Sequence, residues 1–169
     1  DGQVPPLDGK KHKKIAVIGP NADQCILGGY SQAPRVTVSP LQAIKEKYPD
    51  VEIIYSQGVR LTTSGANFRP TRFAPHNENV LLMRQAVKAA RDADAILLML
   101  GGNDVISREA VSAYSPGDLA DLELLGDQNQ LVDSLKILNK PIAAFVFSGP
   151  PISFAHLQQT VPAIVQCWY

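Results

Sequence analysis

Five short runs of apolar, largely β-branched residues recur along this chain, each bounded by Gly, Pro or polar residues. They are KIAVIGP (14–20), VEIIY (51–55), AILLML (95–100), PIAAFVF (141–147) and AIVQCWY (163–169). Runs of this length without polar alternation are typical of strands that are buried on both faces, as in a parallel sheet. The sequence therefore predicts five strands of a mainly parallel sheet.

Segments with helical character separate these runs. The clearest is 39–48, where Ser39 is a good N-cap, Pro40 occupies the first helical position and Gln42 would complete a capping box. Further helices are expected over 77–92 with Asn77 as N-cap, over 127–138, and over 153–159. The stretch 56–76 shows no period and is predicted to be a loop.

Alternating strands and helices predict an α/β domain with an open, mainly parallel sheet sandwiched between helices, in flavodoxin-like layers. We expect a linker over 1–13 and one domain over 14–169, truncated at its carboxyl end and belonging to a multidomain enzyme. Hydrophobic residues make up 45% of the chain and charged residues 19%, which is enough for a packed core.

Composition and motifs exclude several classes of function. Lys+Arg and Asp+Glu are both 16, so the basic excess of a nucleic-acid binder is missing, and no apolar stretch is long enough to span a membrane. The three histidines are scattered and the two cysteines lack ligand spacing, so we expect neither a metal nor a cofactor. The first loop lacks a dinucleotide or P-loop pattern, and Ser148 lacks a nucleophile elbow and is interpreted as a turn former.

Right-handed crossovers bring the loops that follow the strands to one edge of the sheet, where ligands bind in open parallel sheets. The loop 101–124 on that edge is long and carries Glu109 beside Arg108, with Ala110, Val111 and Tyr114 nearby. A carboxyl group among apolar neighbours has a raised pKa and suits a general acid. Glu109 is therefore the first candidate, and Asp104 and Asp118 are the other carboxyl groups to test.

The order of motifs resembles one family. KIAVIGPNAD, LGGYS, VSPLQAIKEKY, ADAILLMLGG with SREA downstream, LELLGDQNQLV, NKPIAAFVFSGPP and VPAIVQCWY together resemble the carboxyl-terminal α/β sandwich domain of glycoside hydrolase family 3. The resemblance extends from about residue 14 to 169. It implies a β-glucosidase-like or β-xylosidase-like enzyme that acts on β-glucosides or related oligosaccharides.

The resemblance also implies a mechanism and a partner domain. Members are retaining, exo-acting glycosidases in which a preceding barrel domain carries the nucleophilic Asp and this domain supplies the acid/base. Such a mechanism needs two carboxyl groups about 5–5.5 Å apart. Glu109 of SREA matches the acid/base, Tyr30 of LGGYS matches an aromatic residue that contacts the sugar, and Arg108 and Asp118 are expected to bind substrate in the same loop.

Two positions depart from the family pattern. Many relatives have Gly-Glu at Gly102-Asn103, and related loops often have Gly-Asp-Arg at Gly117-Asp118-Leu119. The alternative function is a non-catalytic carbohydrate-binding or scaffold module of the same fold. By resemblance we expect a periplasmic or secreted enzyme whose fragment 1–169 is inactive without the barrel.

Overall fold

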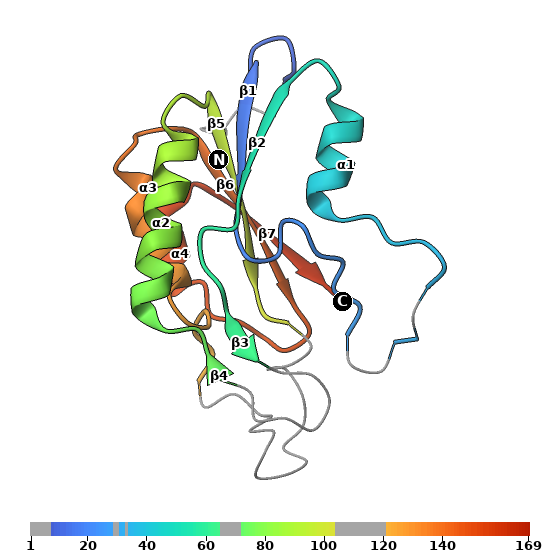
Figure 1. The fold of residues 1–169 in the computed structure, drawn as a ribbon, viewed down its shortest axis with the longest axis vertical. Coiled ribbons are helices and arrows are strands. Elements are labelled where there is room, and N and C mark those ends of the chain that lie inside the picture. Colours follow the sequence, from blue (N-terminus) through green and yellow to red (C-terminus); the bar gives the residue numbers. More distant parts are fainter. Residues whose placement is uncertain (1–7, 29–30, 33, 65–71, 104–120) are drawn as a thin grey trace.

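The computed structural model describes residues 8–28, 31–32, 34–64, 72–103 and 121–169 (Figure 1). The elements alternate as the sequence predicts. In chain order they are β1 (Lys14–Ile18), α1 (Pro40–Lys47), β2 (Glu52–Ser56), β3 (Thr62–Ser64), β4 (Arg72–Phe73), α2 (His76–Ala90), β5 (Ala95–Gly101), α3 (Gln128–Lys136), β6 (Ile142–Ser148), α4 (Ala155–Thr160) and β7 (Ala163–Trp168).

The main sheet has the strand order β2-β1-β5-β6-β7, and all its pairings are parallel. The central strand β5 is buried along its whole length, which explains its uninterrupted apolar sequence. The predicted fold class, an α/β domain with a mainly parallel sheet, is confirmed.

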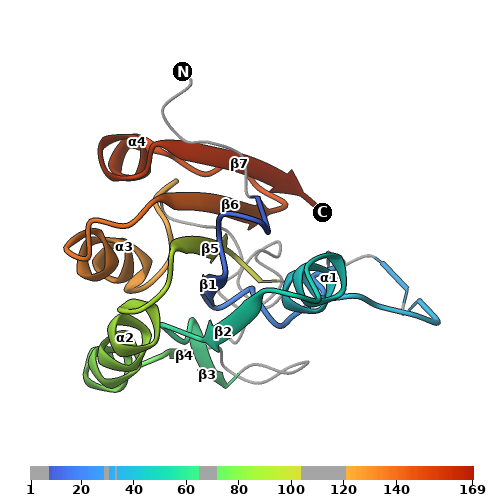
Figure 2. The same cartoon turned by 90° about the horizontal axis from the view of Figure 1, so that it is seen from above.

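Helices lie on both faces of the sheet. Seen from above, α2, α3 and α4 lie on one face and α1 on the other (Figure 2). The larger cluster of buried residues packs between the sheet and the three helices, and includes Met83, Leu131, Leu135 and Leu157. The smaller cluster packs against α1 through Leu41. The alternation of side chains along each strand places its residues in one cluster or the other.

Helix α1 begins as predicted, although half of the expected capping box is not formed. The hydroxyl oxygen of Ser39 accepts a hydrogen bond from the Gln42 backbone N–H at 3.1 Å. The Gln42 side chain instead donates to Glu46 Oε1, one turn further along the helix, at 2.8 Å. The same Ser39 hydroxyl donates to Asp23 Oδ1 at 3.2 Å, which attaches the start of α1 to the loop after β1.

Two local predictions were wrong. Helix α2 begins at His76 with Pro75 at the N-cap position and no side-chain cap, so Asn77 lies inside the first turn. The Pro75 carbonyl oxygen accepts from the backbone N–H groups of Glu78 at 3.1 Å and Asn79 at 3.2 Å, so the first turn closes on Pro75, two residues before Asn77. The predicted loop 56–76 also contains β3 and β4, an antiparallel pair too short to show a period of two.

Candidate functional site

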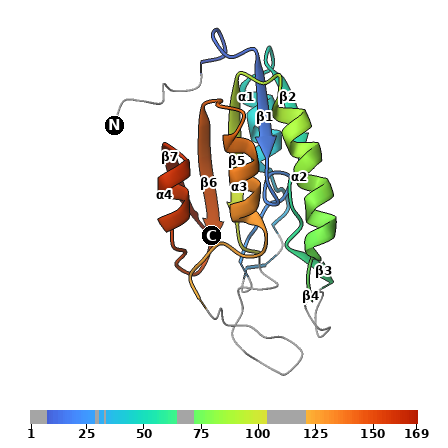
Figure 3. The ribbon, with the colours of Figure 1, turned by 90° about the vertical axis from the view of Figure 1, so that its left-hand side faces the viewer.

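The carboxyl ends of the five parallel strands meet at one edge of the sheet, as predicted (Figure 3). The pair β3-β4 lies beyond this edge (Figure 1). In an open parallel sheet this edge is where ligands bind. The described residues that follow β1, β2, β5 and β6 therefore form the candidate functional site.

Glycines allow three strand ends to approach one another closely. Gly19 directly follows β1, and Gly101 is the last residue of β5. Their φ angles are 138° and 132°, which residues other than glycine rarely adopt. A Cβ on Gly19 would collide with the carbonyl oxygen of Met99, and one on Gly101 with that of Phe147. Asn21 N–H then donates to Met99 O at 3.2 Å, and Gly102 N–H to Phe147 O at 2.9 Å. The ends of β1, β5 and β6 are thus joined through the backbone.

Asn21 is a buried amide at this junction. Its Nδ2 donates to the carbonyl oxygens of Leu100 at 3.1 Å and Gly102 at 3.0 Å. The backbone and the side chain of Asn21 therefore both hold the end of β5. Sequence reasoning did not select Asn21. Its signal was a polar residue soon after a buried strand, but its partners are about eighty residues away in the chain.

Gln128, the first residue of α3, is a second buried amide at the same place. Its Oε1 accepts from Gly101 N–H at 2.8 Å, and its Nε2 donates to Gly101 O at 2.9 Å and to Leu125 O at 2.8 Å. Both of its amide N–H donors and its oxygen are used, and the side chain is fully buried. Leaving such groups unpaired costs about 1–3 kcal/mol. Sequence reasoning missed Gln128 as well.

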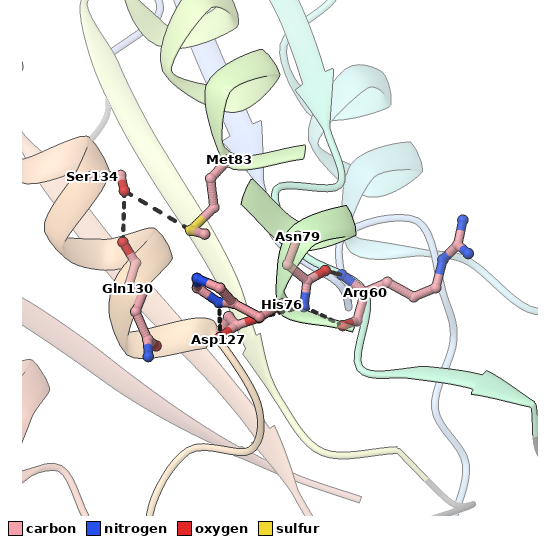
Figure 4. A network of polar contacts seen from close by, with 7 residues as sticks. All are labelled: Arg60, His76, Asn79, Met83, Asp127, Gln130 and Ser134. Atoms are coloured by element: carbon pink, nitrogen blue, oxygen red, sulfur yellow. Dashed lines mark hydrogen bonds and ion pairs between the residues drawn. The ribbon is translucent and has the colours of Figure 1, made fainter. Parts of the chain in front are cut away.

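Asp127, one residue earlier, organises a neighbouring polar network (Figure 4). Asp127 Oδ1 lies 2.9 Å from His76 Nδ1, and Asp127 Oδ2 accepts from Asn79 Nδ2 at 2.8 Å. Asn79 also binds both backbone groups of Arg60, accepting from its N–H at 2.8 Å and donating to its carbonyl oxygen at 3.1 Å. The network fixes the segment after β2 and the start of α2 against the start of α3.

A polar hollow of about 200 Å³ opens beside these two groups of contacts. Several of its lining residues have polar side chains with hydrogen-bond donors and acceptors, which suit hydroxyl-rich ligands. The lining residues are Pro20, Asn21, Gln24, Gln57, Arg60, Leu61, Thr62 and Asn103.

Burial changes the ionisation of two side chains in the outer strands of the sheet. Partial burial, and after it the negative charge of Asp23, raise the pKa of Tyr55 in β2. Burial also raises the pKa of the Cys167 thiol in β7. Cys167 is half-buried and Cys25 is exposed. Both the Tyr55 hydroxyl and the Cys167 thiol are therefore neutral at neutral pH.

Each predicted site residue lies outside the described ranges, namely Tyr30, Arg108, Glu109 and Asp118, and so does the alternative Asp104. Their described neighbours do lie at the carboxyl edge. Gly28, which has φ 78° and accepts from Ser31 N–H, lies beside the ring of Tyr169 together with Gly149. Ser148 donates to Pro150 O at 2.7 Å, as a turn former would.

Across the described ranges, no three His, Cys, Asp or Glu residues form a group that could hold a metal ion. None of the helices in the same ranges has the length and apolar character needed to cross a membrane.

Comparison with known proteins gives a consistent result. The family model for the glycosyl hydrolase family 3 C-terminal domain matches residues 1–169. A β-xylosidase from Formosa agariphila is 32% identical over 100% of this chain and 22% of its own length. A β-glucosidase from Bacteroides ovatus is 30% identical over 97% of this chain and 21% of its own length. The chain thus spans about a fifth of these relatives.

Solved structures agree in fold. A β-glucosidase from Erythrobacter marinus superposes with a TM-score of 0.90 at 37% identity, covering 100% of this chain and 24% of that one. A family 3 exo-β-xylosidase in complex with a xylobiose aziridine probe superposes with a TM-score of 0.74 at 25% identity, covering 97% of this chain and 19% of that one.

Proposed function

Because the chain belongs to glycosyl hydrolase family 3, as its C-terminal domain, we propose that it carries the acid/base carboxyl group of a retaining, exo-acting β-glycosidase. The proposed acid/base is Glu109. The substrates are β-glucosides, β-xylosides or related oligosaccharides, and the relatives named β-xylosidase and β-glucosidase support this choice.

The observation that carries the proposal is the family match over the whole chain, combined with the origin of the Glu109 segment. This segment follows Gly101-Gly102 at the end of β5, on the edge where ligands of parallel sheets bind. On its far side, Leu122 O accepts from Ser153 N–H at 2.6 Å, close to the end of β6. Both flanks of the segment are therefore attached to the carboxyl edge.

A retaining mechanism needs a second carboxyl group about 5–5.5 Å from the acid/base, as nucleophile. We propose that a preceding barrel domain supplies this Asp and that the glycosidic bond is cleaved between the two domains. Glu109 protonates the leaving oxygen in the first step and deprotonates water in the second. Without the barrel, the fragment 1–169 is inactive on this account.

Three further residues complete the proposed site. Tyr30 packs its aromatic ring against the apolar C–H face of a sugar, a contact that suits pyranoses. Arg108 and Asp118 bind the substrate through charged hydrogen bonds. The polar hollow is lined in part by Asn103, at the start of the Glu109 segment, and Gln24, Gln57 and Arg60 of its lining would add contacts to a longer oligosaccharide.

The test is the leaving-group dependence of the full-length Glu109→Gln enzyme. A general acid matters most when the departing oxygen is a poor leaving group, and its loss costs about 10²–10⁴-fold. We expect kcat/KM on a disaccharide to fall by that amount, while kcat/KM on dinitrophenyl glycosides, which reports the first step alone, falls far less. Asp104→Asn is the matched control and should leave the leaving-group dependence unchanged, whereas Asp118→Asn should weaken substrate binding without steepening that dependence. Wild-type rates of Glu109→Gln on the disaccharide would show that the assignment is wrong.

A non-catalytic module is the competing function, and the same experiment addresses it. If the full-length protein binds oligosaccharides but hydrolyses neither the disaccharide nor the activated aryl glycosides, the domain has kept the fold without the chemistry.

A further inference from the structure

Gln128 joins the two flanks of the segment that carries Glu109. Gly101 lies before this segment and Leu125 after it, and the one side-chain amide of Gln128 binds both. Because Gln128 is also the first residue of α3, the amide sits on a helix that packs into the larger core cluster. The flanks are therefore held at a fixed separation by a rigid element.

Asn21 holds the same flank from the opposite side. Its Nδ2 binds the carbonyl oxygens of Leu100 and Gly102, while Gln128 binds both backbone groups of Gly101 between them. Three consecutive residues are thus fixed by two buried amides that come from different parts of the fold. A flank that only had to end a strand would not need side-chain hydrogen bonds on every one of its last residues.

The polar groups of this flank and of the two amides have few alternative hydrogen-bond partners. Asn21 and Gln128 are buried, and so are Gly101 and Gly102, so water does not replace a lost bond easily. There is little room between Gly101 and β6, because a Cβ on Gly101 would already collide with the backbone of Phe147. A loss of either amide would therefore leave buried backbone groups of this flank unpaired.

We propose that Gln128 and Asn21 are positioning residues for the acid/base of this enzyme. They do not touch the substrate. They fix the two ends from which the Glu109 segment leaves and rejoins the sheet, and the placement of the acid/base depends on these ends. This inference rests on the proposed function. A misplacement of about 1 Å at a reacting group can cost on the order of 10²-fold in rate.

The experiment uses the full-length protein with Gln128→Met, which keeps the side-chain length and removes all three hydrogen bonds. We measure kcat/KM over a series of aryl β-glycosides, from dinitrophenyl to unsubstituted phenyl. We expect a loss on the order of 10²-fold for the phenyl glycoside and little change for the dinitrophenyl glycoside. Asn21→Leu should give the same pattern.

The control separates positioning from general stability. Leu135→Ala lies in the same helix and is also fully buried, but it lies about two turns from Gln128. We expect it to lower the unfolding temperature and to leave the leaving-group dependence unchanged. If Gln128→Met does not fold, Gln128→Glu keeps the acceptor for Gly101 N–H, loses both donors and undergoes the same test.

A double mutant distinguishes the proposed role of Glu109 from the proposed role of Gln128 and Asn21. If Gln128 acts through Glu109, adding Gln128→Met to Glu109→Gln causes no further loss on the phenyl glycoside. An unchanged leaving-group dependence in Glu109→Gln overturns the proposed function and this inference with it. If Glu109→Gln steepens that dependence while Gln128→Met and Asn21→Leu lower all rates equally, the positioning role alone is overturned.

Discussion

Single residues at the carboxyl edge work through the backbone of distant segments. Asn21 and Gln128 each bind main-chain groups across long sequence separations, and both look like ordinary polar residues in the sequence. Gly101 was recognisable as the point where the chain leaves a strand, because an apolar run stops there. Its partner Gln128 was not recognisable, because no local pattern indicates that an amide 27 positions later binds that glycine.

Gly101 and Gly126, on either side of the segment that carries Glu109, should respond very differently to substitution. A side chain on Gly101 would collide with the backbone of Phe147, whereas nothing lies within 4 Å of a Cβ on Gly126. Gly126→Ala should cost about 1–2 kcal/mol because its φ is 62°. Gly101→Ala should cost on the order of 4 kcal/mol or more. Thermal unfolding of the full-length variants measures the difference, and equal losses would contradict the close contact.

At the opposite edge of the sheet, Asp94 provides a test of pH dependence. The backbone N–H groups of Lys14 and Lys13 donate to its Oδ2 at 2.9 Å and 2.7 Å and hold the pKa of this carboxyl below 3.8. A lowered pKa in the folded state gives stability that is present above the unfolded pKa and is lost as the pH falls through the folded value. Asp94→Asn should therefore lower the unfolding temperature at pH 7.

The loss caused by Asp94→Asn should shrink as the pH falls below 3.8, because the wild-type carboxyl group then becomes neutral as well. Unfolding temperatures of the two proteins across an acid titration make the comparison. Asp92→Asn, in the exposed turn just before, is the control and should have little effect at either pH. A constant difference across the titration would contradict the role given to the Asp94 carboxylate.

At the scale of elements, prediction succeeded where burial decided the pattern. The run AILLML is buried throughout and became β5, and Leu131 and Leu135 on a helical spacing became the buried face of α3. Prediction failed where local backbone geometry, rather than burial, determined the element. The pair β3-β4 is too short to alternate visibly, and Pro75 rather than Asn77 determined where α2 begins.

Helix α1 allows a paired test of its N-terminal cap. Ser39→Ala removes the bond from Gln42 N–H and the bond to Asp23, and should cost about 1 kcal/mol. Gln42→Ala should cost only a few tenths of a kcal/mol, because its side chain pairs with exposed Glu46 rather than with the cap. Amide hydrogen exchange over 40–47 in the full-length protein measures both. Equal effects would indicate that the reciprocal capping bond does form.

At the scale of the whole molecule, the described helices are distributed unevenly over the sheet. Three of them cover one face, and α1 lies on the other, where Phe145 and Phe147 are half-buried and Val165 is exposed. The sequence predicted helices on both faces, because strand and helix periods are local, but it did not predict their uneven distribution. The assignments of Tyr30 and Glu109 stay predictions, because both residues lie outside the described ranges.

The central claim is that this domain provides the acid/base of a retaining glycosidase, and one product identifies that role directly. In full-length Glu109→Ala, azide can occupy the space of the missing carboxyl group and attack the glycosyl-enzyme intermediate, whose formation from dinitrophenyl glycosides needs little acid assistance. We expect azide to accelerate turnover and NMR to show a glycosyl azide with retained anomeric configuration. Unchanged hydrolysis with no glycosyl azide would contradict the claim.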